Sequence, residues 1–510
     1  MQQDAEANVP GPQVTHVDGA DQASILPTHR DLYYGGAWHR PLSGEYFDLI
    51  SPGTGKSLGH AADGSAADVN AAVDSAFQAF AAWRDVPPLE RAKSLRRFAG
   101  IVRENARELA MLDAIDCGNP VRAMVGDAEI AAAQIDFFAG LVTEMKGTSI
   151  PMGPDRMNVT VREPLGVVAR IIPFNHPFMF AAGKSAAPLA AGNTIVVKPP
   201  EQAPLSALRL AELIEDVFPP GVFNVVTGRG VDTGAALVAH PSVAKVALIG
   251  SVAAGRAVMR SAADTIKPIL LELGGKNALI AFADADPAVV AEAMVAGMNF
   301  AWCGQSCGST SRAFLHAAIH DRVLHEVKAR IGAFRPGRPD DWDTTMGAII
   351  SRPQYERILS YIATAKREGA TLVCGGGSPQ SAALAGGLFV EPTVFADVRP
   401  DMTIAREEIF GPVLSVLKWE DETAMIRDVN AVEVGLTCSV WTNDFNAALR
   451  TANAAQAGYV WVNEVSRHFL GAPFGGVKQS GLGREECLEE LLSFTQEKNI
   501  HMRFARVPPA

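Results

Sequence analysis

Residues 194–226 read TIVVKPPEQAPLSALRLAELIEDVFPPGVFNVV and decide the fold. A short apolar run, Thr194–Val197, is followed by an amphipathic stretch, Ser206–Val217, and then by a second apolar run, Phe223–Val226. Apolar runs without alternation are typical of strands buried on both faces, and a helix between two such strands indicates a parallel sheet covered by helices. The stretch therefore predicts one unit of a doubly wound α/β fold.

The same alternation continues on both sides of this unit. It predicts an α/β architecture for the whole middle of the chain. Predicted strands are Leu165–Ile172, Lys245–Ile249 and Ala278–Phe282, and predicted helices are Thr233–Ala239 and Ala254–Ala263.

A second α/β stretch runs from about residue 286 to residue 457. The tail, Phe494–Phe504, alternates weakly and is predicted to be an edge strand that pairs with another subunit. Within the second stretch, helices are predicted at Pro287–Gly297 and Pro353–Glu368, and strands at Arg312–His316, Val413–Lys418 and Thr437–Thr442.

The N-terminal part begins without periodicity. Residues 1–28 are rich in Gln, Asp, Gly and Pro and are expected to form a loose head. A helix is predicted over Asp68–Trp83 with Asp68 as its N-cap, and a long amphipathic stretch over Glu90–Cys117 with Gly118 as its stop. The apolar stripe of the first helix consists of Val69, Val73, Ala76, Phe77 and Phe80.

Composition limits the classes of function. The 510 residues allow two or three domains, and the net charge of −11 argues against a surface that binds nucleic acid or anionic lipid. Six cysteines are too few for a disulfide framework. No signal peptide is visible, and the most apolar stretch, Phe178–Val197, is interrupted by Lys184 and Asn193. We expect a soluble cytoplasmic protein.

Two glycine turns end predicted strands and open predicted helices. Residues 225–230 read VVTGRG, and the next glycine, Gly234, gives the spacing GxGxxxG where the dinucleotide fingerprint requires GxGxxG. Gly250 and Ser251 follow the other strand, where backbone N–H groups and the helix end can hold a diphosphate. Ordinary strand-to-helix glycines are the alternative for both turns.

The run Lys198-Pro199-Pro200-Glu201 follows a buried strand. The ligand crevice of a doubly wound sheet lies beyond such strand ends. A carboxylate there accepts both ribose hydroxyls of an adenosine and repels a 2′-phosphate. A solvated loop is the alternative.

Cys307 lies in the small-residue run GQSCGS at 304–309. A cysteine nucleophile needs a lowered pKa or a nearby base, and donors for the oxyanion that it creates; a buried structural thiol is the alternative. Cys303, Cys307, His316 and His320 resemble zinc ligands, but only eight residues separate Cys307 from His316 where a finger needs about twelve. We expect no metal.

Glu272 follows the apolar run 268–271 directly. A carboxylate among leucines and glycines is a candidate general base with a raised pKa. An ion pair with Lys276 is the alternative. Together with the residues above, seven motifs occur in this order: Pro173-Phe174-Asn175, Lys198-Pro199-Pro200-Glu201, Gly250-Ser251, Glu272-Leu273-Gly274-Gly275-Lys276, Gly304-Gln305-Ser306-Cys307, Glu408-Ile409-Phe410-Gly411-Pro412 and Pro473-Phe474-Gly475-Gly476.

This order of motifs resembles the aldehyde dehydrogenase superfamily from about Leu32 to the C-terminal tail. The resemblance implies that Cys307 attacks the aldehyde, that Asn175 and the Cys307 N–H hold the oxyanion, and that Glu272 activates the water that hydrolyses the thioester. Lys184 is assigned to the same catalytic set. Members that transfer the acyl group to coenzyme A lack the glutamate, so its presence implies release of a free acid. A structural protein that derives from the family and no longer catalyses is a further alternative. The presence of Cys307, Glu272 and Asn175 argues against it.

The resemblance also implies a cofactor site for NAD, with NADP as the weaker candidate because of Glu201. Lys198 and Glu201 would hold the adenosine ribose, and Gly250 and Ser251 the diphosphate. The remaining cofactor residues are Gly230, Glu408 at the nicotinamide ribose and Phe410 beside the ring.

The expected substrate pocket is aromatic. The family often carries an aromatic residue where His176 stands and commonly an asparagine where Trp302 stands. We therefore expect an aromatic or other hydrophobic aldehyde, unless these side chains only pack in the core. Alternatively, Arg467 and His468 at the tunnel mouth select a semialdehyde or carboxylated aldehyde. The expected pocket residues are His176, Phe178, Trp302, Phe469 and Phe474.

Cys303 lies four residues before Cys307, and on a helical turn the two thiols would be neighbours that form a reversible disulfide. The implied architecture is an NAD-binding domain (29–142 and 162–274), a catalytic domain (275–487) and a bridging element (143–161 and 488–510). The bridging element is expected to build a homodimer or homotetramer.

Overall fold

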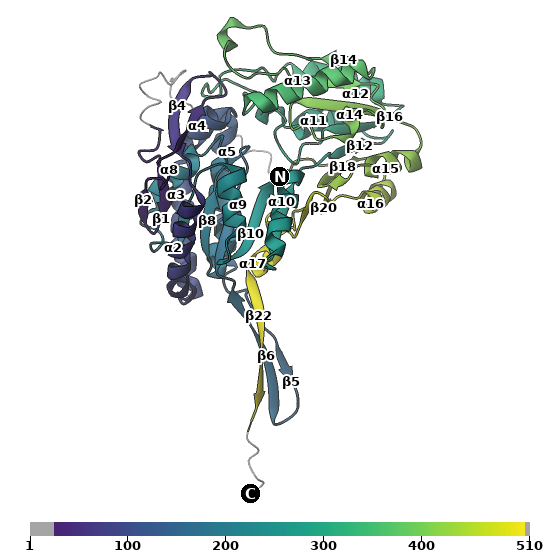
Figure 1. The fold of residues 1–510 in the computed structure, drawn as a ribbon. Coiled ribbons are helices and arrows are strands. Elements are labelled where there is room, and N and C mark those ends of the chain that lie inside the picture. Colours follow the sequence, from purple (N-terminus) through teal and green to yellow (C-terminus); the bar gives the residue numbers. More distant parts are fainter. Residues whose placement is uncertain (1–24, 505–510) are drawn as a thin grey trace.

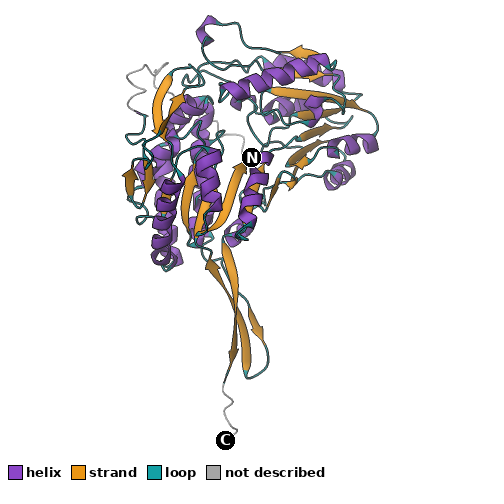
Figure 2. Cartoon of the chain, in the orientation of Figure 1, coloured by secondary structure: helices purple, strands orange, loops and turns teal. Residues whose placement is uncertain are grey.

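The computed structural model describes residues 25–504. It contains two large β-sheets that helices cover, and a narrow arm (Figure 1). Most of the expected loose head lies outside the described residues, as do residues 505–510. Helices cover both faces of each sheet, and the arm consists of strands alone (Figure 2). The α/β fold class predicted from residues 194–226 is therefore confirmed.

The first sheet has the strand order β2-β1-β9-β8-β7-β10-β11-β21. Its core from β9 to β11 is parallel, whereas β1 and β21 join the two sides of this core in antiparallel orientation. The central strands are almost wholly buried because their apolar runs have helices on both faces. The bounds are β1 Leu32–Tyr34, β2 Ala37–His39, β7 Val167–Ile171, β8 Thr194–Lys198, β9 Phe223–Val225, β10 Val243–Gly250, β11 Ile269–Leu273 and β21 Gly481–Leu482.

Two of the described helices around this sheet, α2 and α10, begin at a serine whose side chain caps the helix. The first begins after Ser65, whose side chain accepts from the Asp68 N–H, so the prediction of Asp68 as N-cap is wrong by three residues. Phe77 is 59% exposed, so it does not belong to the buried stripe. The helices are α2 Ala66–Arg84, α3 Pro88–Glu104, α4 Ala106–Cys117, α5 Val121–Gly140, α6 Pro177–Gly183, α7 Ala186–Ala191, α8 Leu205–Ile214, α9 Ala235–Ala239 and α10 Val252–Ala263.

The stretch predicted as one helix over 90–117 is two helices. The chain breaks at Asn105, which separates α3 from α4. Gly118 then ends α4 with φ +91°, a left-handed conformation that favours glycine, as expected for a C-terminal stop.

The second sheet has the order β14-β15-β16-β13-β12-β18-β19 and is parallel except for β14. Its strands are β12 Ala278–Ala281, β13 Arg312–His316, β14 Thr371–Cys374, β15 Thr393–Ala396, β16 Val413–Trp419, β18 Thr437–Trp441 and β19 Tyr459–Val462. Its helices are α11 Pro287–Gly297, α12 His320–Ile331, α13 Arg352–Arg367, α14 Thr403–Arg406, α15 Glu422–Asn430 and α16 Phe445–Ala454.

The arm is a sheet with the order β22-β6-β5 that projects from the first sheet (Figure 1). The tail is an edge strand, as predicted, and pairs on one side with β6 of the same chain, with Thr495 opposite Pro164 and Arg503 opposite Arg156. Its pairing with another subunit stays a prediction. The bounds are β5 Ser149–Pro151, β6 Arg156–Pro164 and β22 Thr495–Arg503, and α17 Leu488–Ser493 precedes β22.

Two small strand pairs complete the described elements: β3 Tyr46–Ile50 with β4 Ser57–Ala62, and β17 Val434–Gly435 with β20 Val477–Lys478. The expected division of the chain places residues 481–482 with the second sheet, whereas β21 pairs with β11 in the first. Among residues 25–504, no helix has the length and apolar character that crossing a bilayer requires.

Candidate active site

Several candidate residues lie at or just beyond the carboxyl ends of the central strands of the first sheet. Ile171 of β7 pairs with Lys198 of β8 on one side and with Leu248 of β10 on the other. The chain runs from β7 through β8 to β9 and then returns to β10 on the opposite side of β7. The strand order therefore reverses between β7 and β10, which is where doubly wound sheets bind their ligands. Asn175 follows β7, and Ser251 follows β10 directly.

Lys198, Glu201 and Gly230 form one polar corner. The Lys198 Nζ lies 3.7 Å from Glu201 Oε2, and the Gly230 N–H donates to the same oxygen at 2.8 Å. Burial lowers the pKa of Lys198 to about 8, although Glu201 acts in the opposite direction. Beside this corner lies a cavity of 530 Å³, whose lining includes Glu201 and Arg229.

Ser251 caps α10. Its side chain accepts from the Ala254 N–H at 3.1 Å, so the helix begins at the strand-order reversal. The first-turn N–H groups of a helix carry partial positive charge, which suits an anionic group.

Glu408 approaches the glycine pair that follows Glu272. The Gly275 N–H donates to Glu408 Oε1 at 2.9 Å. A Cβ at Gly274 would lie 2.0 Å from Glu408 Oε2, so this approach requires glycine. Burial raises the pKa of Glu408, whereas the hydrogen bond from the Gly275 N–H and the charge of Lys276 lower it.

Phe410 lies close to the candidate oxyanion residue. Its ring meets that of Phe174 edge-on at 5.7 Å, and Phe174 directly precedes Asn175. Asn175 is 4% exposed, its backbone carbonyl accepts from the Asn119 side chain at 2.7 Å, and its Oδ1 has no hydrogen-bond partner among the described residues. The amide group is thus buried and available to a ligand.

Cys307 lies in a loop that two side chains hold in place. Asn277 Nδ2 donates to the Cys307 carbonyl at 2.6 Å and to the Ser309 carbonyl at 3.0 Å, and the Ile350 N–H donates to Gln305 Oε1 at 3.1 Å. The thiol is half-buried. Burial raises the pKa of Cys307 to about 12, and the charges of the Glu272 and Glu408 carboxylates raise it as well. Hydrogen bonds from the N–H groups of Cys307 and Gly308 act in the opposite direction.

Cys303 is not on a helical turn with Cys307. It follows a single 3₁₀ turn, Phe300–Trp302, has φ +55° and is fully buried. The prediction of a helical neighbour is therefore wrong. All six cysteines lie within residues 25–504 and are free thiols.

Glu272 is a buried carboxylate near the end of β11. It is 4% exposed, and its Oε1 has no partner within the described part of the chain. Burial raises its pKa well above the ordinary value, as does the charge of Glu485, whereas Lys184 lowers it. The alternative ion pair with Lys276 is wrong, because the Lys276 Nζ is buried without any described partner.

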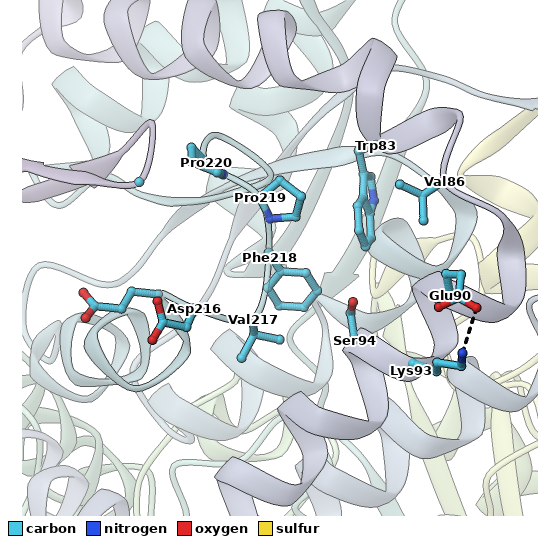
Figure 3. Close-up of a pocket in the computed structure, with 12 residues that line it drawn as sticks. Trp83, Val86, Glu90, Lys93, Ser94, Asp216, Val217, Phe218, Pro219 and Pro220 are labelled. Carbon is cyan, nitrogen blue, oxygen red and sulfur yellow. Dashed lines mark hydrogen bonds and ion pairs between the residues drawn. The ribbon is translucent and has the colours of Figure 1, made fainter.

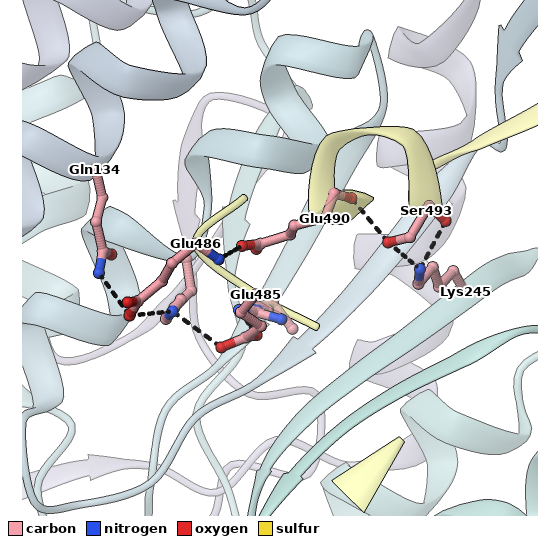
Figure 4. A network of polar contacts seen from close by, with 8 residues as sticks. Gln134, Lys245, Glu485, Glu486, Glu490 and Ser493 are labelled. Carbon is pink, nitrogen blue, oxygen red and sulfur yellow. Dashed lines mark hydrogen bonds and ion pairs between the residues drawn. The ribbon is translucent and has the colours of Figure 1, made fainter. Parts of the chain in front are cut away.

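A buried ionic network around Glu485 and Glu486, shown in Figure 4, was not predicted from the sequence, and Lys184 belongs to it. Its Nζ lies 2.9 Å from Glu485 Oε2 and 3.3 Å from Glu486 Oε1, and Arg170 Nη2 lies 2.7 Å from Glu485 Oε1. None of the ion pairs or hydrogen bonds of residues 25–504 joins Lys184 to Cys307, Asn175 or Glu272. The run Arg484-Glu485-Glu486 after a glycine turn was the available sequence signal.

His468 closes this network at the surface. Its Nδ1 lies 3.0 Å from Glu486 Oε2. Burial alone would raise the pKa of Glu486, but Lys184 and His468 hold it at about 2. Arg467 is exposed, and its backbone carbonyl accepts from the Trp461 indole. Of the two expected cations at the tunnel mouth, His468 is therefore already engaged with a carboxylate.

The expected pocket residues do not form one group. The rings of His176 and Trp302 meet edge-to-face at 4.7 Å, beside Asn175 and the cysteine loop in sequence. Phe474 is buried 4.4 Å from the His468 ring. Phe178 has no exposed surface and packs in the core, so its assignment to the pocket is not supported, and Phe469 is 76% exposed at the surface.

A larger cavity, of 720 Å³, lies elsewhere (Figure 3). Trp83, Phe218 and Pro219 line it together with Glu90 and Lys93, and the candidate catalytic residues do not. Residues 25–504 contain no cluster of His, Cys, Asp and Glu side chains that could hold a metal ion.

Comparisons with known proteins define the class. The model of the aldehyde dehydrogenase family matches residues 38–500. The chain is 52% identical over 485 residues to aldehyde dehydrogenase tropH of Talaromyces stipitatus, covering 94% of each chain. It is 41% identical over 478 residues to betaine aldehyde dehydrogenase of Brucella melitensis, covering 93% of this chain and 97% of the relative.

Solved structures agree. The indole-3-acetaldehyde dehydrogenase AldA of P. syringae, in a mutant form in complex with NAD+ and IAA, superimposes with a TM-score of 0.93 at 37% identity, covering 96% of this chain and 100% of that one. The fold and the family match are those of an oxidoreductase that acts on aldehydes. The chain belongs to the aldehyde dehydrogenase family.

Proposed function

We propose that the protein oxidises an aromatic or other hydrophobic aldehyde to the free carboxylic acid with NAD. The observation that carries this proposal is the pairing of a half-buried thiol, Cys307, with a buried carboxylate, Glu272, close enough for the carboxylate to raise the pKa of the thiol. A nucleophile and a base that share one buried site can form and then hydrolyse an acyl-enzyme without a metal.

The residues present fit a dinucleotide. Glu201 and Lys198 offer a carboxylate and an ammonium to a ribose diol, and Glu201 would repel a 2′-phosphate, which favours NAD over NADP. Gly250 and Ser251 at the start of α10 suit a diphosphate. The contact of Glu408 with Gly275 leaves its second oxygen for the other ribose. The NAD+ complex of AldA supports the same cofactor.

The first half-reaction forms a thioester. The Cys307 thiol gives its proton to solvent, and the resulting Sγ thiolate attacks the carbonyl carbon. The oxyanion of the adduct accepts hydrogen bonds from Asn175 Nδ2 and the Cys307 N–H. NAD, when bound, supplies the acceptor for the hydride that leaves the substrate carbon. The acyl group then remains on Sγ.

The second half-reaction releases the acid. Glu272 takes a proton from water, the water oxygen attacks the thioester carbon, and the C–S bond breaks to return the free thiolate. Glu272 must be ionised for this step, so burial, which raises its pKa, moves the onset of the step to a higher pH than an exposed carboxylate would give. Lys184 acts as a positioning residue, because its positive charge lowers the pKa of Glu272 and so opposes the effect of burial.

The Glu272→Gln variant separates the two half-reactions. It should form about one NADH per active site in a burst and then turn over 10²–10⁴ times more slowly, the usual contribution of a general base. Unchanged steady-state turnover would exclude the assigned role. Cys307→Ala should abolish the burst as well.

The substrate class is tested by NADH formation over an aldehyde panel. The panel contains benzaldehyde, carboxybenzaldehyde, hexanal, succinic semialdehyde and betaine aldehyde, each with NAD and with NADP. Preference for benzaldehyde supports an aromatic pocket around Trp302 and His176. Preference for a carboxylated aldehyde would instead assign Arg467 to the substrate.

We also assign functions to the three sheets. The first sheet would bind the cofactor, and the second would carry the cysteine loop. The arm would build a homodimer or homotetramer, since β22 and β5 both present an unpaired edge among the described strands. A reducing compartment such as the cytoplasm suits the six free thiols.

A further inference from the structure

A pair of touching rings next to the reacting groups carries hydrogen-bonding capacity that the proposed reaction does not use. His176 directly follows Asn175, and Trp302 lies five residues before Cys307. The two rings meet edge-to-face, with centroids 4.7 Å apart and an interplanar angle of 79°. Both rings thus stand next to the oxyanion amide and the nucleophile along the chain.

Asp127 of α5 orients the imidazole. Its Oδ2 lies 2.7 Å from His176 Nδ1, and the side chains are 1% and 8% exposed. In the tautomer whose Nδ1–H donates to this carboxylate, Nε2 presents a lone pair. No residue of the described chain forms a hydrogen bond with this Nε2.

The Trp302 indole supplies the complementary group. Its Nε1 is buried and finds no acceptor in residues 25–504. An indole N–H can only donate, and leaving such a donor unpaired in the interior is unfavourable because it has lost its hydrogen bond to water. A ligand oxygen at this position would satisfy it.

An acceptor on one ring and a donor on the neighbouring ring match a hydroxyl group, which donates one hydrogen bond and accepts another. The surroundings are apolar: Trp302 packs against Met111 and Met124, and Phe180 lies edge-on to His176 at 5.8 Å. A phenolic hydroxyl is more acidic than an aliphatic one and is therefore the stronger donor to an imidazole backed by a carboxylate.

We propose that the Asp127–His176 pair and the Trp302 indole bind the ring hydroxyl of a hydroxylated aromatic aldehyde. This inference rests on the proposed oxidation of aromatic aldehydes and narrows its substrate class. The hydroxyl donates to His176 Nε2 and accepts from Trp302 Nε1–H, and these two bonds orient the aldehyde carbon toward Cys307.

The test compares matched aldehydes on the full-length enzyme with NAD. The kcat/KM values are measured for benzaldehyde, for its 2-, 3- and 4-hydroxy derivatives and for the corresponding methoxy compounds. At least one hydroxy isomer should exceed benzaldehyde by about 10- to 100-fold, because a site built for a hydroxyl leaves buried polar groups unpaired with the analogue that lacks it. Its methoxy counterpart, which cannot donate, should lose that advantage.

Variants assign the preference to these residues. Trp302→Phe keeps the ring and removes the N–H, and Asp127→Asn removes the charge that orients His176. Each should bring the ratio of hydroxy to unsubstituted kcat/KM toward one, mainly through KM. Trp38→Phe, at a tryptophan of β2 that stacks on His29 and whose Nε1 is likewise buried without a described acceptor, is the control for the indole. His320→Gln, in a second histidine–aspartate contact on α12, is the control for the imidazole, and both should leave the ratio unchanged.

Binding without turnover gives a second readout. In Cys307→Ala, calorimetry should show the hydroxybenzoate product binding more tightly than benzoate, and Trp302→Phe in that background should remove the difference. If benzaldehyde is oxidised as efficiently as every hydroxy isomer, or if both variants keep the wild-type ratio, this inference is wrong while the proposed function stands. If no aldehyde yields NADH, the proposed function itself fails.

Discussion

Replacing Lys184 by methionine tests whether the buried ionic network holds the site together. Lys184 is the cation shared by Glu485 and Glu486, and its side chain is 4% exposed. Methionine keeps most of the volume and removes the charge. Glu485 would retain Arg170, and Glu486 would retain His468 and the side-chain amide of Gln134.

The magnitude follows from the pKa of Glu486. This carboxyl titrates at about 2 in the fold, against about 4.3 for a free glutamate, and at 1.36 kcal/mol per unit the difference is worth about 3 kcal/mol at neutral pH. Breaking a buried pair costs about 3–5 kcal/mol, because a charge is left without compensation. We therefore expect Lys184→Met to lose about 3–5 kcal/mol of unfolding free energy.

The loss should depend on pH in a definite direction. A lowered folded-state pKa contributes stability above the unfolded-state value, and that contribution disappears as the pH falls through the folded-state pKa. The difference between wild type and variant should thus be largest near neutral pH and should shrink from about pH 4 toward pH 2.

The assay is denaturant unfolding, followed by tryptophan fluorescence, at neutral and at acidic pH. The double variant Lys184→Met, Glu486→Gln should recover part of the loss, because it removes the unpaired carboxylate too. Lys498→Met, which removes the exposed contact with Glu163 on the arm, is the control and should cost less than about 1 kcal/mol. A loss at Lys184 below about 1 kcal/mol, equal at both pH values, would refute the reasoning.

Three further predictions concern the site. Gly274→Ala should raise the KM for NAD at least about tenfold with an unchanged circular dichroism spectrum, because the new Cβ displaces the Glu408 carboxylate; an unchanged KM would contradict that. Glu201→Gln should improve the ratio of NADP to NAD efficiency by about tenfold, since it removes the charge that opposes a 2′-phosphate; a constant ratio would exclude Glu201 as the discriminator. Alkylation of Cys307 by iodoacetamide should keep rising above pH 9, since its pKa is raised to about 12, and Glu272→Gln should lower that pKa and speed alkylation at a given alkaline pH; a plateau below pH 9 in the wild type would be the contrary result.

The central strands were predictable from sequence, because burial on both faces leaves a continuous apolar run. β8 extends the predicted strand 194–197 by one residue, and the predicted strand 312–316 has the same bounds as β13. The edge strands gave no such signal. β21 has two residues, and β2 is only partly buried, so they form because the neighbouring strand is already in place.

The candidate catalytic residues were predictable where a reactive side chain stands in an unusual stretch of sequence and the motifs follow one another in a known order. Glu272 and Cys307 lie in runs of small or apolar residues that are unusual for reactive groups. The ionic network was not predictable, because a charged residue reads as solvent-exposed unless its partners are known. Asp127 likewise meets His176 only because α5 packs against α6, and nothing in their separation of 49 residues indicates the contact.

The pairing of β22 with β6 has a consequence for synthesis on the ribosome. β6 ends at Pro164, but its partner begins only at Thr495, so one edge of β6 stays open while more than 300 residues are made. The first sheet also waits for β21, which completes it beside β11. Late pairing of distant strands slows folding and exposes edges to aggregation. Removing the last strand should therefore harm the yield of folded protein more than its distance from Cys307 suggests.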